Sequence, residues 1–239
     1  MIGTALAWFA ASILGGVTAS VAGFGIGSIL TPVLATRYSV ADAILAVSLP
    51  HAVATAVRCW RLRHAIDRSL LKGFGVASAA GGLTGAFLLL GFESWAALVL
   101  GLLLIATGLA GLTGWNTRSQ PGRTTSVILG GLSGLFGGMA GNQGGLRAAA
   151  LTTYRLAPAQ FVATSTAVGL MVDAARLPVY LASGSDRIAE LAVPIAIATV
   201  GVVVGTLFGE KLLLSLSPAR FRQIISVLIT ALGIWLLLG

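Results

Sequence analysis

The chain has 239 residues, of which 56% are hydrophobic and only 9% are charged, and its net charge is +8. Soluble domains carry about 25% charged residues, and a soluble fold of this length has no core large enough to bury so much apolar surface. The composition therefore excludes a soluble protein and predicts an all-α polytopic membrane protein. One cysteine and two histidines argue against a metal centre. We expect no cofactor and no nucleic-acid partner, because basic residues in the loops of a membrane protein set its orientation.

Apolar runs separated by polar residues predict eight membrane segments. In chain order they span residues 3–36, 40–60, 70–91, 95–114, 124–154, 158–182, 189–210 and 218–238. The first run has no basic residue before it and continues past the small residues at 20–22. We therefore interpret it as a membrane helix and not as a signal peptide.

The first and fifth segments are too long for a single crossing. Each has more than thirty residues, or about 45–50 Å of helix, whereas the hydrocarbon core of a bilayer is about 30 Å thick. Glycine clusters interrupt both segments, with AGFGIGS at 22–28 and GGMAGNQGG at 137–145. We expect broken helices or re-entrant hairpins at these two places.

The two halves of the chain resemble each other. An offset of 118 residues aligns Gly16 with Gly134, Gly23 with Gly141, Gly27 with Gly145, Arg37 with Arg155 and Arg58 with Arg176. The later segments align more weakly, Gly81 with Gly201 at an offset of 120 and residues 106–109 with 231–234 at an offset of 125. A polar stretch at 116–125 separates the halves. We predict two four-segment transmembrane repeats, 1–115 and 120–239.

Basic residues distinguish two topologies. If all eight segments cross and the N-terminus is inside, the inside loops hold eight basic residues and the outside loops hold five. If the N-terminus is outside and the first and fifth segments are re-entrant, the counts are eleven inside and two outside, Arg37 and Arg187. The second topology fits the positive-inside rule better. Its halves are inverted repeats with discontinuous helices, a plan known from secondary transporters. We expect a multi-pass protein of the cell (inner or plasma) membrane.

Two glycine-rich stretches carry a family resemblance. They are GGVTASVAGFGIGSILTPVL at 15–34, with G-x-G-x-x-x-x-P at its break, and GGLSGLFGGMAGNQGGLRAAAL at 130–151. With the length and the duplication, they resemble the sulfite exporter TauE/SafE family of membrane transporters over essentially the whole chain. The second stretch departs from the pattern, with Ala150 where the first has Pro32. The resemblance implies transport of a sulfur-containing anion, such as sulfite or the organosulfonate sulfoacetate.

Helix breaks inside a membrane suit an anion. They leave free backbone N–H groups at the positive end of a helix dipole, and glycines let the backbone approach a ligand closely. Arg147, the only charged residue of 124–154, adds a forked cationic donor. Alternatively, the glycines serve only tight helix crossing and Arg147 extends to the membrane surface. The predicted substrate-binding residues are Gly25, Gly27, Ser28, Ser48, Asn142, Gln143, Gly144, Gly145, Arg147, Thr166 and Arg176.

Asp173 and His51 are candidates for ion or proton coupling. Asp173 is the only acid well inside a predicted segment, and intramembrane carboxylates often take part in proton or ion movement. Histidine is the side chain that ordinarily titrates near neutral pH. The alternatives are structural, because Asp173 and Arg176 are three residues apart and can pair on one helix face, and His51 can serve helix packing.

These features favour a secondary transporter, an exporter, of sulfur-containing anions. Its expected partners are the anion, membrane lipid and a second copy in a homodimer. The alternatives are a channel-like anion conduit and an uptake transporter for another small anion. A membrane enzyme is the weakest reading, since no catalytic triad, metal cluster or paired carboxylates occur in the sequence.

Overall fold

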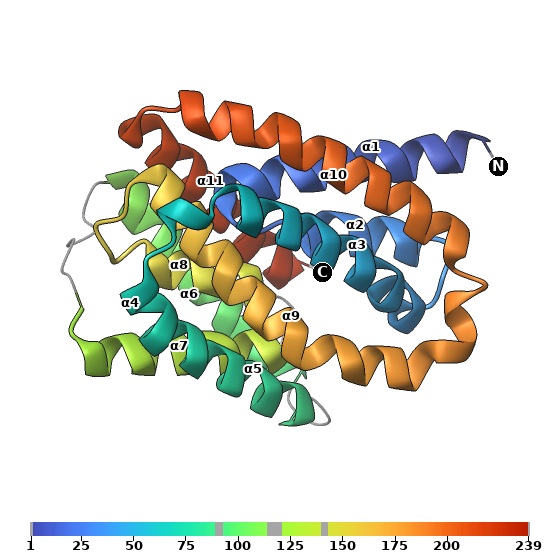
Figure 1. The fold of residues 1–239 in the computed structure, drawn as a ribbon. Coiled ribbons are helices and arrows are strands. Elements are labelled where there is room, and N and C mark those ends of the chain that lie inside the picture. The colour runs from blue at the N-terminus through green and yellow to red at the C-terminus, as the bar shows by residue number, and fades with distance from the viewer. Residues whose placement is uncertain (1, 89–92, 114–120, 140–142, 239) are drawn as a thin grey trace.

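The computed structural model describes residues 2–88, 93–113, 121–139 and 143–238 (Figure 1). Nearly all of them lie in helices, and these ranges contain no strand, so the all-α prediction is confirmed. The helices are α1 (Ile2–Ala22), α2 (Ile26–Ala35), α3 (Val40–Arg61), α4 (Arg68–Leu70), α5 (Val76–Leu88), α6 (Glu93–Thr113), α7 (Arg123–Met139), α8 (Gln143–Leu151), α9 (Pro158–Ile188), α10 (Ala192–Ser215) and α11 (Pro218–Leu238), with a 3-10 turn η1 (Arg63–Ala65) and a π turn η2 (Leu71–Gly75).

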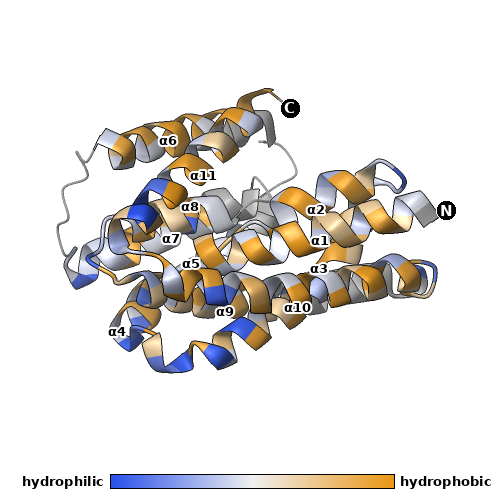
Figure 2. Ribbon diagram, turned by 90° about the horizontal axis from the view of Figure 1, so that it is seen from above, coloured by the Kyte–Doolittle hydropathy of each residue, from blue (hydrophilic) through white to orange (hydrophobic). Residues whose placement is uncertain are grey.

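The described helices have the length and surface of membrane spans. Four are long and apolar enough to cross a bilayer, namely Gly3–Ala22 of α1, Asp42–Arg61 of α3, α10 and α11. Large apolar side chains on α6, α10 and α11 are exposed, Leu102, Phe208 and Leu238 among them. Figure 2 shows apolar residues along most helices and hydrophilic ones gathered at their ends. Lipid is the solvent that such a surface requires, which confirms the membrane prediction.

The first segment folds back on itself at a glycine break. Gly23 and Gly25 have φ angles of 79° and 131°, values that side chains disfavour, so α1 stops here and α2 returns along it. The far end of α2 lies at the start of α1, where Arg37 Nη2 donates to Thr4 Oγ1 at 3.4 Å and the rings of Trp8 and Tyr38 lie 5.8 Å apart. This geometry is that of a re-entrant hairpin, which the length of the segment predicted.

The fifth segment has the same form. α7 and α8 pack against each other, and the Tyr154 hydroxyl, just after α8, donates to Ser126 Oγ near the start of α7 at 2.9 Å. The chain therefore returns to the end from which it entered. The predicted break at 140–142 lies outside the described residues.

Glycines let helices from the two halves of the sequence pack closely and reciprocally. α1 packs on α10, and α5 packs on α7. A Cβ at Gly205 would overlap the Ile13 carbonyl oxygen, and a Cβ at Gly81 would overlap that of Gly131, which is 118 residues after Ile13. These contacts favour Gly205 as the counterpart of Gly81, one helical turn beyond the Gly201 of the sequence alignment. In both pairs, a glycine late in one half of the sequence packs on a helix early in the other half or the reverse.

The same reciprocity joins α6 and α11. A Cβ at Gly108 would lie 2.7 Å from the Ser226 carbonyl oxygen, and a Cβ at Gly233 would lie 2.7 Å from the Gly101 carbonyl oxygen. Residue 226 follows Gly101 by 125 positions, as Gly233 follows Gly108, so the predicted offset of 125 describes this packing. The early part of α6 faces the late part of α11, and the two helices therefore run antiparallel.

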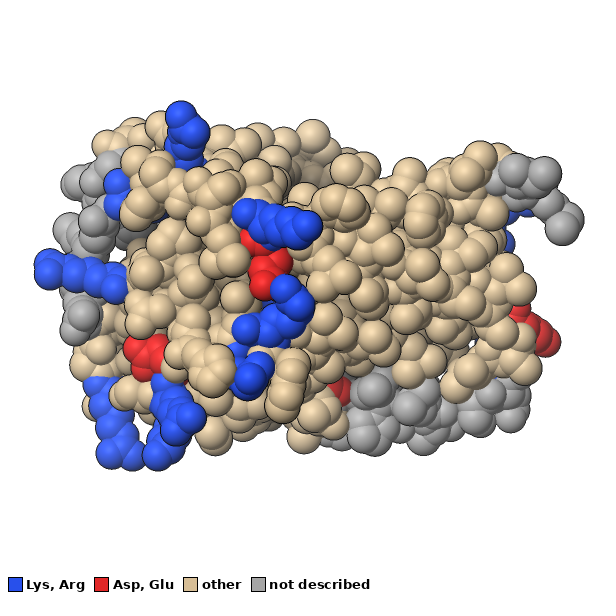
Figure 3. Space-filling view, turned by 45° about the horizontal axis from the view of Figure 1, so that its top comes forward, with Lys and Arg blue, Asp and Glu red and all other residues tan. Residues whose placement is uncertain are grey.

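Basic side chains gather at one end of the helices. Lys72, Arg123 and Arg155 line one cavity there, and Figure 3 shows most of the visible basic side chains on one half of the molecule. Arg187 lies at the opposite end, where its Nη1 contacts both carboxylate oxygens of Asp42 at 2.6 and 2.7 Å. This distribution is the one expected for re-entrant first and fifth segments.

Candidate functional site

Arg147 is buried at the junction of the two hairpins, with 5% of its surface exposed. Its Nε donates to Ser165 Oγ on α9 at 3.0 Å, and its Nη2 donates to the Gly23 carbonyl oxygen at 3.3 Å. Ser165 Oγ donates to the same carbonyl at 3.3 Å. The guanidinium thus ties α8 to the break between α1 and α2. Its burial excludes the alternative in which Arg147 extends to the membrane surface.

Gly169 of α9 makes room for this guanidinium. A Cβ at Gly169 would lie 3.1 Å from Arg147 Nη2 and 3.3 Å from its Cζ. The cationic group therefore rests close to the α9 backbone, and a Cβ at 169 would require it to shift by a few tenths of an ångström.

The two glycine-rich segments meet beside this arginine. A Cβ at Gly144 would lie 2.5 Å from Phe24 Cβ, at the centre of the first break. Gly145 instead faces Leu232 and Leu104, on α11 and α6, and so serves helix packing. Of these two predicted glycines, only Gly144 lies against the other break.

Arg58 is a second buried arginine, with 2% of its surface exposed. Its Nε donates to Thr166 Oγ1 on α9 at 2.8 Å, whereas its buried Nη1 has no hydrogen-bond partner among the described residues. The count of eleven inside basic residues included Arg58 as a loop residue. That was wrong, because α3 continues as a helix through Arg58 to Arg61 and packs against α9. Without Arg58 ten basic residues remain inside, against two outside, so the preferred topology is unchanged.

His51 and Asp173 join α3 to α9. His51 Nδ1 lies 2.8 Å from Asp173 Oδ2, and the two side chains are 26% and 25% exposed. The Thr55 hydroxyl lies 3.5 Å from the same nitrogen. His51 thus gives Asp173 a partner from the other half of the sequence. The pairing with Arg176 that sequence spacing suggested stays a prediction, because the Arg176 side chain lies outside the described residues.

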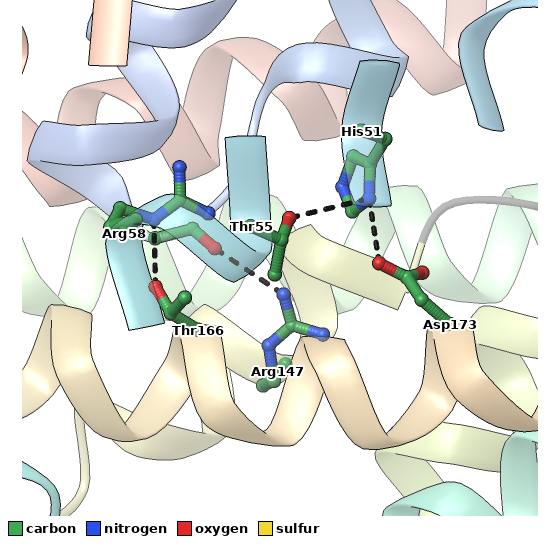
Figure 4. A network of polar contacts seen from close by, with 7 residues as sticks. His51, Thr55, Arg58, Arg147, Thr166 and Asp173 are labelled. Carbon is green, nitrogen blue, oxygen red and sulfur yellow. Dashed lines mark hydrogen bonds and ion pairs between the residues drawn. The ribbon is translucent and has the colours of Figure 1, made fainter. Parts of the chain in front are cut away.

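These side chains form one polar cluster, defined here as Arg58, Arg147, Thr166, His51 and Asp173. In the view of Figure 4, the Arg147 side chain lies between Arg58 and Asp173. The two arginines repel each other electrostatically, and Asp173 attracts both. The cluster thus combines two guanidinium groups with a single carboxylate.

Nearly the whole chain matches a known protein family. Residues 8–236 match the family model described as "Sulfite exporter TauE/SafE". The chain belongs to this family. No curated protein and no solved structure matches the TauE/SafE chain. Membership makes it a membrane transporter of the sulfite-exporter type, as the sequence resemblance implied.

The other predicted site residues of this TauE/SafE protein that the structure describes lie on α2 and α3 or just before α2. Gly25 precedes α2, and its carbonyl accepts from Ile29 N at 3.0 Å. No atom lies within 4 Å of a Cβ built at Gly27, so the space beside the first turn of α2 is open, and Ser28 follows it half-buried. Ser48 Oγ donates to the Leu45 carbonyl of its own helix at 2.7 Å.

The side chains of two predicted residues at the second break lie outside the described part of the chain. Asn142 lies outside the described residues, and Gln143 begins α8 but its side chain is not described. Among the described residues, no group of three His, Cys, Asp or Glu could hold a metal ion.

Two polar residues at this site, Arg58 and Ser165, are absent from the list of predicted substrate-binding residues. For Arg58, its alignment with Arg176 and its place inside a segment were signals. Ser165 lies in the polar run Thr164–Thr166, which marks this part of α9 as unusual for a membrane helix.

Proposed function

We propose that this protein is a secondary transporter, working as an exporter, of sulfur oxyanions such as sulfite and sulfoacetate. It binds the anion beside Arg147, where α8 meets the break between α1 and α2. The observation that carries the proposal is the pair of buried arginines, Arg58 and Arg147, of which Arg58 leaves Nη1 without a partner in the part of the chain that the structure describes.

Charge balance supports an anionic ligand. Burying a charge without a partner costs several kcal/mol, roughly, even after relaxation. The cluster holds two guanidinium groups and one carboxylate, and Asp173 is already engaged with His51. Asp42 pairs with Arg187 and Glu210 pairs with Arg61, so these two acids do not neutralise the cluster. With neutral His51 the cluster carries one positive charge in excess, which a bound anion neutralises.

The donors present suit a sulfonate or sulfite group. Such a group offers up to three oxygens, and a guanidinium offers parallel N–H donors with the spacing of two oxygens. The hydroxyls of Ser165 and Thr166 lie beside the two arginines. The open space at Gly27 adjoins the N-terminal turn of α2, whose backbone N–H groups favour an anion.

We also propose that residues 1–115 and 120–239 are inverted repeats related by an axis in the membrane plane. The reciprocal glycine contacts support this, because equivalent helices α6 and α11 run antiparallel. α3 and α9 do too, since His51 lies beside Asp173 and Arg58 beside Thr166. A two-fold axis that relates equivalent helices of opposite direction must be perpendicular to these helices. The anion site then lies close to the axis, where alternating access operates in such transporters.

Counterflow in proteoliposomes tests the function. Purified protein should exchange labelled sulfite or sulfoacetate against the same unlabelled anion, with saturation, whereas a channel gives flux without counterflow. Taurine and thiosulfate, run in parallel, define the chemistry that the site accepts. Arg63→Ala is the matched control, because Arg63 is exposed and contacts the Trp60 ring. Absence of counterflow with every sulfur anion would exclude the proposal.

A further inference from the structure

The His51–Asp173 pair is the part of the cluster that can change its charge. The pair spans α3 and α9 and is partly open, since about a quarter of each side chain is exposed. Arg58 and Arg147, in contrast, are buried and keep their charge under all physiological conditions. A histidine next to a carboxylate can gain or lose a proton near neutral pH.

The charged groups around His51 come from few elements. Asp173 faces it from α9, Arg147 of α8 acts on that carboxylate, and Arg58 lies two turns further along α3. α2 has no charged residue. The acid of α10, Glu210, pairs with Arg61, ten residues or about 15 Å along α3 from His51. The side chain of Arg176, on α9, is outside the described part.

The protonation state of His51 sets the charge that the cluster offers to an anion. Among the described groups of the cluster, two arginines and one carboxylate leave one positive charge when the imidazole is neutral, and two when it is protonated. The first state matches a singly charged sulfonate, and the second matches an anion with two charges. Asp173 Oδ2 accepts from Nδ1 in the neutral form, so the additional proton is taken up at Nε2.

We propose that the protein takes up one proton on His51 when it binds a doubly charged sulfur oxyanion, and releases both together. The inference rests on the proposed function and adds the coupling ion to it. Asp173 stabilises the imidazolium, and the bound dianion neutralises the second positive charge of the cluster. The proton comes from the solvent on one side of the membrane and returns to the solvent on the other, without any covalent change.

Calorimetric titration of purified protein between about pH 6 and pH 8 tests the coupling. The probes are sulfoacetate, which carries two charges throughout this range, and methanesulfonate, which carries one. Sulfoacetate binds the protonated state better, so its affinity falls as the pH rises, by up to about tenfold per pH unit. Methanesulfonate affinity does not fall in this way.

Two substitutions separate coupling from a structural role. His51→Gln leaves one positive charge at every pH, so sulfoacetate binds weakly and without pH dependence. Asp173→Asn leaves two positive charges with a neutral imidazole, so sulfoacetate binds tightly, again without pH dependence. A purely structural pair would respond alike to both changes. His64→Gln is the matched control, because His64 is the other histidine of the chain and is exposed.

The outcomes are distinct. A sulfoacetate affinity of the wild type that does not change with pH overturns the inference, and so does unaltered pH dependence in both variants. Should either variant fail to fold, the other still decides between these results. If the wild type binds neither anion at any pH, the proposed function itself fails, and the coupling fails with it.

Discussion

Substitution of Arg147 by alanine should weaken anion binding without unfolding the protein. The change removes a guanidinium that is 5% exposed and that donates to Ser165 and to the Gly23 carbonyl. It also removes one of two buried positive charges, which lowers the repulsion on Arg58. The loss of two hydrogen bonds and the relief of charge oppose each other, so the free energy of unfolding should change little.

The expected loss of affinity follows from the donors. Arginine has five N–H groups, and Arg147 uses two of them in the hydrogen bonds to Ser165 and Gly23. A charged hydrogen bond contributes about 1.5–3 kcal/mol, or roughly ten- to a hundred-fold in affinity. Arg147→Ala should weaken sulfite or sulfoacetate binding by about that factor. Arg147→Lys should recover only part of it, because an ammonium lacks the planar fork.

Tryptophan quenching or calorimetry on purified protein measures this effect. Arg187→Ala is the control, because that arginine lies at the far end of the helices and pairs with Asp42. It should leave the affinity unchanged. If Arg147→Ala bound the anion with wild-type affinity, the assignment of Arg147 to the anion site would be refuted.

Three further results are expected. Gly169→Ala should weaken anion binding several-fold, because the new Cβ lies 3.1 Å from a guanidinium nitrogen and displaces it; unchanged affinity would show that this close contact is unimportant. Asp173→Asn should abolish transport driven by a proton gradient while leaving anion exchange intact, measured in the same vesicles with and without the gradient. In a background without Cys59, a single cysteine within 183–187 should be labelled from outside and one at Gln120 from inside; labelling of both from one side would exclude inverted halves.

The fold was largely predictable because its decisive features are local. Glycine clusters within segments of more than thirty residues predicted the hairpins, and Gly23 and Gly25 adopt the positive φ angles that such residues allow. The length of α2, ten residues, could not be predicted from the sequence. Its length depends on where the return path meets the start of α1, which is set by packing.

The candidate site was predictable only in part. Arg147 was conspicuous as a lone charge in an apolar segment, and the structure buries it at the first break. Arg58 was counted with the loop residues Arg61 and Arg63, which follow it closely, although the predicted segment 40–60 contains it. Its burial and its hydrogen bond to α9 separate it from them. His51 and Asp173 are 122 residues apart. Spacing rules for one helix apply only to residues such as Arg176 and could not reveal the histidine on α3.

The packing of α1 on α10, α5 on α7 and α6 on α11 has a consequence for the independence of the two halves. Each half of the sequence finds the partners of its closest glycine contacts in the other half, at Ile13 and Gly205, at Gly81 and Gly131, and at Gly108 and Ser226. The halves are therefore interleaved and do not form two bodies joined by a linker. Expressed alone, either half would expose flat strips of helix backbone. Co-expressed as separate chains, the halves should assemble into one particle, with residues 116–125 dispensable as a covalent link.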